Sequence, residues 1–184
     1  LEVFAQHGAN IFACARRESS GFSEIINKVA RETKSSIIPV YFDFADSEQI
    51  KSAIKEIISF KKQIDVLVNN AGIAAGSFFQ MASIKDMKQV FEVNFFSQIL
   101  FTQGISRYMS RFRSGSIINI ASTAGIIADA GTIIYGASKA ALILATKTMS
   151  VELGDMNIRK CNRAKYYQNG YVRSNGGEGK EQAC

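Results

Sequence analysis

Short apolar segments alternate with longer amphipathic segments along most of this chain. Apolar segments of about four to eight residues between polar or small residues favour buried β-strands, and apolar residues repeated at helical spacing favour helices. Strands that alternate with helices predict an α/β fold with a doubly wound parallel sheet. The predicted strands lie near 10–15, 37–42, 64–69 and 116–121, and the predicted helices lie at 1–7, near 22–33 and 47–61, within 84–112, and near 134–153.

A tyrosine and a lysine, Tyr135 and Lys139, lie four residues apart, and Ser122 lies thirteen residues before the tyrosine. On a helix, residues four positions apart share a face. An ammonium beside a phenol favours the phenolate and lowers a phenol pKa of about 10 toward neutrality. The pair therefore has the chemistry of a general acid and base, although two exposed side chains on a helix would show the same spacing.

Two of the apolar segments end in small or polar residues. The segment 64–68 is followed by the sequence Asn-Asn-Ala-Gly at 69–72, and the segment 116–121 is followed by Ser122. Asn94 lies between the two segments. In this order and at these separations, and together with the tyrosine and lysine pair, the motifs closely resemble the short-chain dehydrogenase/reductase family. The resemblance implies a Rossmann-like fold.

The resemblance, which covers about residues 1–159, also implies a reaction: hydride transfer between a nicotinamide cofactor and a carbonyl or alcohol. By analogy, Tyr135 is the acid for reduction and the base for oxidation, and Ser122 holds the carbonyl oxygen. Lys139 lowers the pKa of Tyr135 and binds the nicotinamide ribose. Asn94 links Lys139 to solvent through water, with an ordinary helix amide as the alternative. The cofactor-binding residues implied in this part of the chain are Asn70, Ala71, Gly72, Tyr135 and Lys139.

The choice between NADP and NAD depends on the end of the first predicted strand. Ala15 stands where NAD-selecting folds commonly place a carboxylate, and Arg16 and Arg17 follow it. A guanidinium there can bind the 2′-phosphate of NADP, so NADP(H) is favoured over NAD(H), although two arginines on an exposed loop are the alternative. Asp43 and Phe44 stand where family members contact the adenine ring. As a bare acid after a strand, Asp43 could equally be a helix N-terminal residue.

Both ends of the chain depart from the family pattern. Relatives begin with a strand and a glycine-rich turn that holds the cofactor pyrophosphate, whereas Leu1 enters the pattern inside the following helix. We therefore expect a fold truncated at the N-terminus and poor NADPH binding by this chain as written. The sequence also diverges after about residue 159. We divide it into a partial Rossmann-like domain, 1–159, and an atypical polar basic tail, 160–184, which either a lost reading frame or a divergent tail would explain.

Charge and composition limit the kinds of partner, metal site and cellular location that we expect for this chain. The formal net charge is +6, and residues 159–184 carry six of the 22 Lys and Arg but only two of the 16 Asp and Glu. A basic tail with tyrosines leaves nucleic-acid binding as a weak alternative. No apolar run approaches the roughly 20 residues of a membrane span, and the N-terminus does not read as a cleavable leader. The three cysteines lack metal-ligand spacing, so we predict no metal site and a cytoplasmic, reducing environment.

These observations predict an NADPH-dependent carbonyl reductase. A 3-oxoacyl thioester is one candidate substrate, because reductases of that kind resemble this spacing and because the apolar segment 125–130 is expected to line the pocket. An inactive relative that acts by association is the alternative function. The helices within 84–112 and near 134–153 carry more apolar residues than one sheet-facing surface needs, which predicts a homodimer or homotetramer, with packing inside the monomer core as the alternative.

Overall fold

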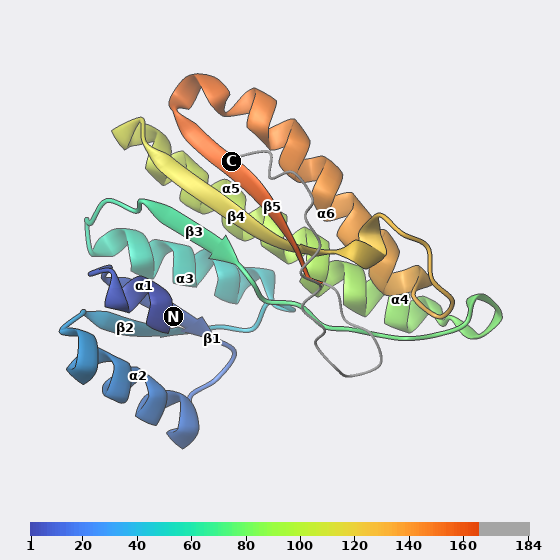
Figure 1. Ribbon diagram of the computed structural model, residues 1–184, viewed down its shortest axis with the longest axis horizontal. Coiled ribbons are helices and arrows are strands. Elements are labelled where there is room, and N and C mark those ends of the chain that lie inside the picture. The colour runs from blue at the N-terminus through green and yellow to red at the C-terminus, as the bar shows by residue number, and fades with distance from the viewer. Residues whose placement is uncertain (166–184) are drawn as a thin grey trace, which may run out of the picture. The chain divides into compact units, whose positions relative to one another are not determined.

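The computed structural model describes residues 1–165, which divide into two compact units, Leu1–Lys61 and a second unit that begins at Lys62 (Figure 1). The first unit contains α1 (Glu2–Gln6), β1 (Ile11–Ala15), α2 (Ser20–Thr33), β2 (Ile37–Tyr41) and α3 (Ser47–Ser59). The second unit contains β3 (Val66–Asn69), α4 (Ile84–Phe91), a π turn (Glu92–Phe96), α5 (Ser97–Met109), β4 (Gly115–Ser122), α6 (Ile133–Glu152) and β5 (Ile158–Lys165). Short 3₁₀ turns lie at Phe79–Met81, Ser110–Phe112, Thr123–Gly125 and Gly154–Met156.

In the first unit, β1 and β2 pair in parallel, with Ala15 opposite Tyr41. The strand pair continues one residue further, since the Phe42 N–H donates to the Ala15 carbonyl at 3.0 Å. The helix α3 begins at Asp46, whose carboxylate accepts the N–H groups of Glu48 and Gln49 and so satisfies two donors of the first turn. The carboxyl ends of β1 and β2 and the start of α3 therefore meet at one edge of this unit.

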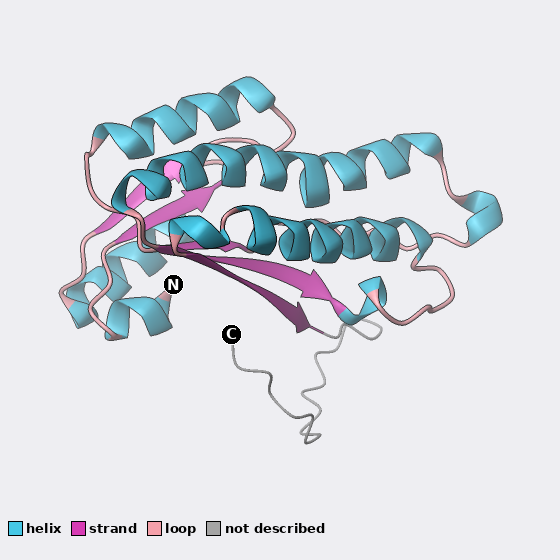
Figure 2. Cartoon of the chain, turned by 90° about the horizontal axis from the view of Figure 1, so that it is seen from above, coloured by secondary structure: helices cyan, strands magenta, loops and turns pink. Residues whose placement is uncertain are grey.

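In the second unit, β4 is the central strand and pairs in parallel with β3 on one side and β5 on the other. The helices α5 and α6 pack along this sheet, as Figure 2 shows. Ile117 on β4 and Leu142 on α6 are completely buried, which marks the centre of this core. Each such side chain contributes about 1.5 to 3 kcal/mol by leaving water.

A chain of buried polar side chains crosses the same core. Asn69 on β3 lies opposite Asn119 on β4, and its Nδ2 donates to Asn119 Oδ1 at 2.7 Å and to Thr102 Oγ1 on α5 at 2.6 Å. Asn119 Nδ2 in turn donates to Thr146 Oγ1 on α6 at 2.7 Å. Because Thr102 and Thr146 both reach this asparagine pair, α5 and α6 cover the same face of the sheet.

The sequence predicts one helix within 84–112, and the structure divides that helix. A π turn at Glu92–Phe96 separates α4 from α5 and contains Asn94, whose side chain is fully buried. A π turn adds a residue to the helical repeat and is often found where a helix presents a functional side chain. Periodicity alone does not reveal this irregularity, because the residues on either side keep the helical pattern.

The α/β fold with parallel strands is confirmed, and the four predicted strands lie within two residues of the observed bounds. The sequence analysis did not predict the strand β5, which extends beyond residue 160, where the predicted basic tail begins. The division into 1–159 and 160–184 stays a prediction, and residues 166–184 lie outside the described part. Among the described residues, β1 and β3 each pair on one side only, so the strands form two sheets.

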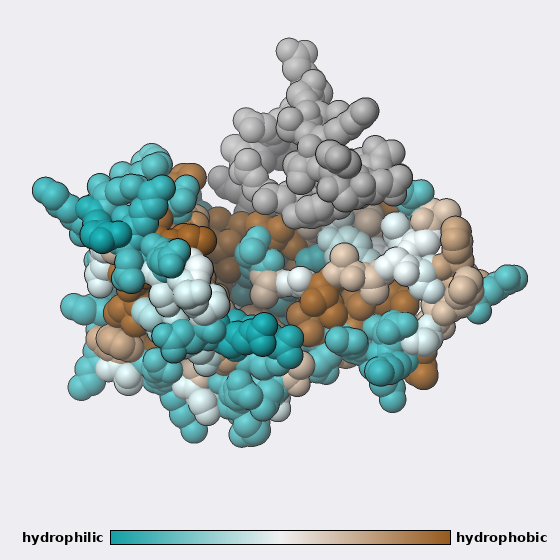
Figure 3. All heavy atoms as spheres, turned by 90° about the horizontal axis from the view of Figure 1, so that it is seen from below, coloured by the Kyte–Doolittle hydropathy of each residue, from teal (hydrophilic) through white to brown (hydrophobic). Residues whose placement is uncertain are grey.

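The described surface carries large apolar side chains among the polar ones, visible as brown areas in Figure 3. The most exposed of them in the second unit include Phe79 and Met81 before α4, Ile126 before α6, and Val151 near the end of α6. No helix in the described part of the chain combines the length and the apolar character that a membrane span needs.

Candidate active site

The turn after Ser122, the last residue of β4, and the first two turns of α6 approach each other closely. Ser122 is 1% exposed, and its hydroxyl accepts the Ala124 N–H at 3.2 Å. A Cβ added at Gly136 would lie 2.5 Å from the Ala124 carbonyl oxygen, and one added at Gly125 would lie 2.8 Å from the Ala140 nitrogen. Contacts of this length exclude a side chain at either glycine. The two glycines therefore allow the turn after Ser122 to pack directly on the helix that carries Tyr135.

Tyr135 and Lys139 share one face at the start of α6, as their spacing predicts. The Lys139 Nζ lies 5.8 Å from the centre of the Tyr135 ring. Lys139 is 4% exposed, and its ammonium donates to the Ile120 carbonyl at 2.8 Å. Burial lowers the pKa of Lys139 below its ordinary value, because the charged amine loses hydration. A buried cation beside the phenol is the arrangement that favours the phenolate.

Asn94 joins the π turn to the loop after β3. Its Oδ1 accepts the Ile73 N–H at 2.8 Å, and its Nδ2 donates to the Ile73 carbonyl at 2.9 Å and to Ser138 Oγ at 3.1 Å. A Cβ at Gly72 would lie 3.2 Å from Asn94 Oδ1 and 3.5 Å from Lys139 Nζ. The structure thus brings Gly72, Asn94 and Lys139 together, which a helix amide pointing to solvent would not do.

Gln98 is a neighbour of this site that the sequence analysis missed. It is 1% exposed, and its Nε2 donates to the Ala71 carbonyl at 2.5 Å. Its Oε1 is a buried side-chain acceptor without a hydrogen-bond partner among the described residues. Gln98 fixes the backbone between Asn70 and Gly72. Its position four residues after Asn94 is the only signal in the sequence that could have indicated it.

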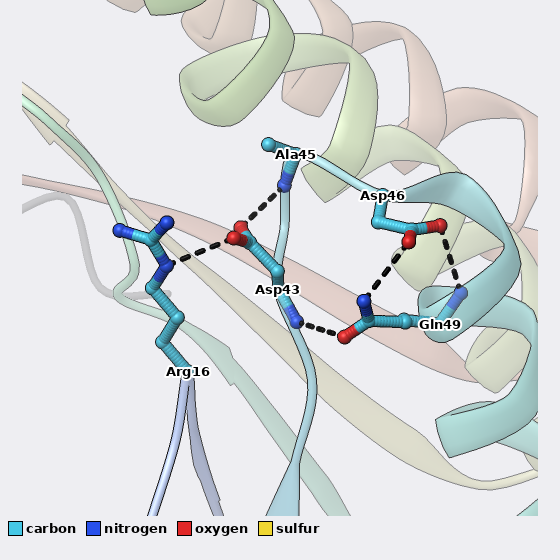
Figure 4. Close-up of polar contacts among 5 residues, drawn as sticks. All are labelled: Arg16, Asp43, Ala45, Asp46 and Gln49. Carbon is cyan, nitrogen blue, oxygen red and sulfur yellow. Dashed lines mark hydrogen bonds and ion pairs between the residues drawn. The ribbon is translucent and has the colours of Figure 1, made fainter.

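In the first unit, two residues that we assigned to the cofactor contact each other. Arg16 Nε donates to Asp43 Oδ2 at 2.8 Å (Figure 4). Asp43 is not the N-cap of α3, since Asp46 has that position. The Phe44 ring packs against Phe42 with ring centres 5.0 Å apart.

Comparison with known proteins decides the family. The family model described as short chain dehydrogenase matches residues 1–173. The chain belongs to the short-chain dehydrogenase family. Two curated relatives are 3-oxoacyl-[acyl-carrier-protein] reductases: that of Thermotoga maritima is 35% identical over 157 residues and that of Aquifex aeolicus is 37% identical over 160 residues. In both comparisons the alignment covers 85% of this chain and 63% of the relative.

A solved structure supports the same fold. Gluconate 5-dehydrogenase from Burkholderia cenocepacia, in complex with NADP and tartrate, has a TM-score of 0.80 at 26% identity and is matched over 90% of this chain and 66% of its own. The chain therefore spans a little under two thirds of the length of the curated relatives that it matches.

The described residues of each unit fit the group that short-chain dehydrogenases use, a nicotinamide dinucleotide. In the second unit, a Cβ at Gly72 would be in tight contact with Asn94 Oδ1 at 3.2 Å, and Lys139 Nζ lies beside the same position at 3.5 Å. In the first unit, the Arg16 side chain is 79% exposed and offers guanidinium donors that match a phosphate. Asn70 and Arg17 are exposed, and no side-chain contact with another residue of the described part, 1–165, supports a role for either. The roles of all these residues stay predictions.

Proposed function

We propose that the protein is an NADP-dependent reductase of carbonyl compounds that uses Tyr135 as its proton donor. The main support is the buried Lys139 ammonium 5.8 Å from the Tyr135 ring, on a helix that packs against the turn after Ser122. Membership of the short-chain dehydrogenase family supports the oxidoreductase class.

In this proposal the nicotinamide supplies the hydride, and the chain's own residues handle the proton. The Tyr135 hydroxyl gives its proton to the carbonyl oxygen as that oxygen becomes an alkoxide, and takes a proton from the alcohol in the reverse direction. The Ser122 hydroxyl donates a hydrogen bond to the same oxygen. The nearby Lys139 cation favours the phenolate over the phenol, because an ammonium stabilises a neighbouring negative charge.

Each unit by itself carries residues that we assign to the cofactor. In the second unit, Lys139 would bind the nicotinamide ribose, and the backbone at Ala71 and Gly72 would lie along the cofactor. In the first unit, Arg16 would bind the 2′-phosphate, which favours NADP over NAD. The Burkholderia cenocepacia gluconate 5-dehydrogenase structure contains NADP, which supports this preference for NADP.

We propose a 3-oxoacyl thioester as the substrate. The two relatives at 35% and 37% identity are reductases of that kind. The turn after Ser122 carries Ile126 and Ile127, which are 71% and 62% exposed. Apolar side chains at this position suit a substrate with an acyl chain, because burying about 100 Å² of apolar surface is worth about 2.5 kcal/mol.

The test is Tyr135→Phe, made in a chain extended at its N-terminus by a strand and a glycine-rich turn, because we expect the chain as written to bind NADPH poorly. Turnover is assayed by NADPH oxidation with acetoacetyl-coenzyme A as the 3-oxoacyl thioester. We expect the variant to lose turnover by at least about a hundredfold, the usual contribution of a general acid, while NADPH affinity stays within a few-fold. Tyr41→Phe, which removes an exposed hydroxyl from β2, is the matched control and should keep full turnover. Undiminished turnover in Tyr135→Phe would refute the proposed role.

We also propose that copies of the protein associate as a dimer or tetramer through the helices α4, α5 and α6. Among the apolar residues that predicted association, Val90 is 1% exposed and belongs to the core, whereas Leu144 on α6 is 66% exposed. Val151 on the same helix is 79% exposed. Leu144→Asp should convert a dimer or tetramer into a monomer in light scattering, and Lys55→Asp, at an exposed position on α3, should not. A monomeric wild type at micromolar concentration would contradict the proposal.

A further inference from the structure

Arg16 and Asp43 follow the ends of β1 and β2, at the same edge of the parallel strand pair. Ala15 ends β1, Tyr41 ends β2, and the two residues are opposite each other in the register. One residue after Ala15 and two residues after Tyr41, the chain therefore places a guanidinium and a carboxylate side by side, and Arg16 Nε donates to Asp43 Oδ2 at 2.8 Å. The Arg16 side chain is 79% exposed and that of Asp43 is 27% exposed.

The carboxylate of Asp43 is itself held in place. Its Oδ1 accepts the Ala45 N–H at 2.8 Å, and the Asp43 N–H donates to Gln49 Oε1 at 2.9 Å. Gln49 Nε2 donates to Asp46 Oδ2 at 2.9 Å, and Asp46 caps α3. Figure 4 shows this series of contacts running from the guanidinium to the first turn of the helix. Asp43 is therefore anchored at its backbone and at one of its two carboxylate oxygens, and its other oxygen bonds Arg16.

The contact with Asp43 uses only one edge of the guanidinium. It occupies Nε, and Figure 4 draws no contact between Asp43 and the two terminal nitrogens of Arg16. These terminal nitrogens are the donors that bind a phosphate in a bidentate manner. An arginine on an exposed loop normally samples many rotamers, and a ligand that fixes it must offset the lost side-chain entropy. Here the contact with Asp43 restrains the side chain before any ligand binds.

We propose that Asp43, held by Gln49, sets the cofactor preference by orienting Arg16 toward the 2′-phosphate of the adenine nucleotide. This inference rests on the proposed use of NADP. It gives Asp43 a role beyond the adenine contact that the family resemblance implies, and it gives Gln49 a role as the residue that positions Asp43. The opposite possibility is that the carboxylate competes with the phosphate for Arg16 and weakens NADP binding.

The experiment compares two ligands that share adenine and differ at the 2′ position, adenosine 2′,5′-bisphosphate and adenosine 5′-monophosphate. Their affinities for the full chain are measured by NMR titration for the wild type and for Arg16→Ala, Asp43→Asn, Gln49→Leu and the double variant Arg16→Ala/Asp43→Asn. The readout is the ratio of the two affinities, in which any contact with adenine cancels. Glu48→Gln is the matched control, because it removes a neighbouring negative charge that pairs with Lys51 instead of Arg16.

We expect Asp43→Asn to lower the preference for the 2′-phosphate roughly twofold to tenfold, the effect of leaving one long side chain for the ligand to order. Gln49→Leu should lower it in the same direction, and Glu48→Gln should not lower it. Adding Asp43→Asn to Arg16→Ala should change the ratio no further. The ¹⁵N relaxation of Arg16 Nε should show greater motion in Asp43→Asn than in the wild type.

The other outcomes separate the positioning role of Asp43 from the proposed use of NADP through Arg16. A ratio that rises in Asp43→Asn would show competition and overturn this inference, and so would an equal loss for both ligands, which would limit Asp43 to adenine. A ratio unchanged by Arg16→Ala would instead overturn the proposed use of NADP through Arg16.

Discussion

The buried asparagine pair predicts a specific effect of Thr146→Val. Asn119 is completely buried and Thr146 is 3% exposed, so no water can replace the threonine hydroxyl. Asn119 Nδ2 donates to that hydroxyl at 2.7 Å, and the substitution would leave this donor without an acceptor. Thr146 Oγ1 also donates to the Leu142 carbonyl, which keeps its helical partner and so loses little.

The magnitude follows from these contacts. A buried donor left unpaired costs about 1 to 3 kcal/mol, whereas valine replaces threonine with nearly the same shape and helix propensity. With a urea m-value of about 2 kcal/mol per molar, a loss of about 2 kcal/mol lowers the unfolding midpoint by about 1 M. Turnover should fall as well, because Asn119 and Thr146 join the strand that ends in Ser122 to the helix that carries Tyr135.

Two controls separate the lost hydrogen bond from other effects. Thr148→Val makes the same change on the same helix at an exposed position, where the hydroxyl donates to Leu144 at 3.2 Å, and should change the free energy of unfolding by less than about 0.5 kcal/mol. Thr146→Ser keeps the hydroxyl and should recover part of the loss. Urea unfolding followed by circular dichroism measures all three variants. Equal midpoints for Thr146→Val and Thr148→Val would refute the reasoning.

Two further predictions concern the helix α6. Gly136→Ala should destabilise the protein by about 1 to 3 kcal/mol and reduce turnover, since its Cβ would lie 2.5 Å from the Ala124 carbonyl oxygen. Gly21→Ala is the control in thermal unfolding, because a Cβ there would meet no atom within 4 Å. Similar melting temperatures for the two variants would contradict the predicted clash at Gly136. Because the pKa of Lys139 is lowered in the folded state, the unfolded chain binds that proton more tightly, and stability should rise with pH from the lowered value up to the ordinary 10.5. Lys139→Met should remove this rise from urea unfolding measured across that range, and an unchanged pH profile would show that burial of the amine is not its cause.

The elements and the tyrosine and lysine pair could be predicted from the sequence, because both depend on local spacing. Apolar periodicity decides whether a segment can bury one face as a strand or a helix, and it placed β1, β2, β3 and β4 within two residues. A separation of four residues puts Tyr135 and Lys139 on one helix face whatever the rest of the chain does. Likewise, strand alternation with helices implies parallel pairing, as β4 shows with both of its neighbours.

The contacts between distant segments were decided only by the tertiary structure. Gln98 reaches the Ala71 carbonyl, and Asn119 reaches Thr146, across 27 residues of sequence in each case. No local pattern encodes such a partner, since a buried amide or hydroxyl bonds whichever group the packing brings within about 3 Å.

The same holds for Arg16 and Asp43, which the sequence presents as two separate ligand contacts. The register of β1 with β2 makes them one ion pair. Side-chain chemistry was therefore readable from the sequence, and the assignment of each side chain to its partner depended on strand register and helix packing.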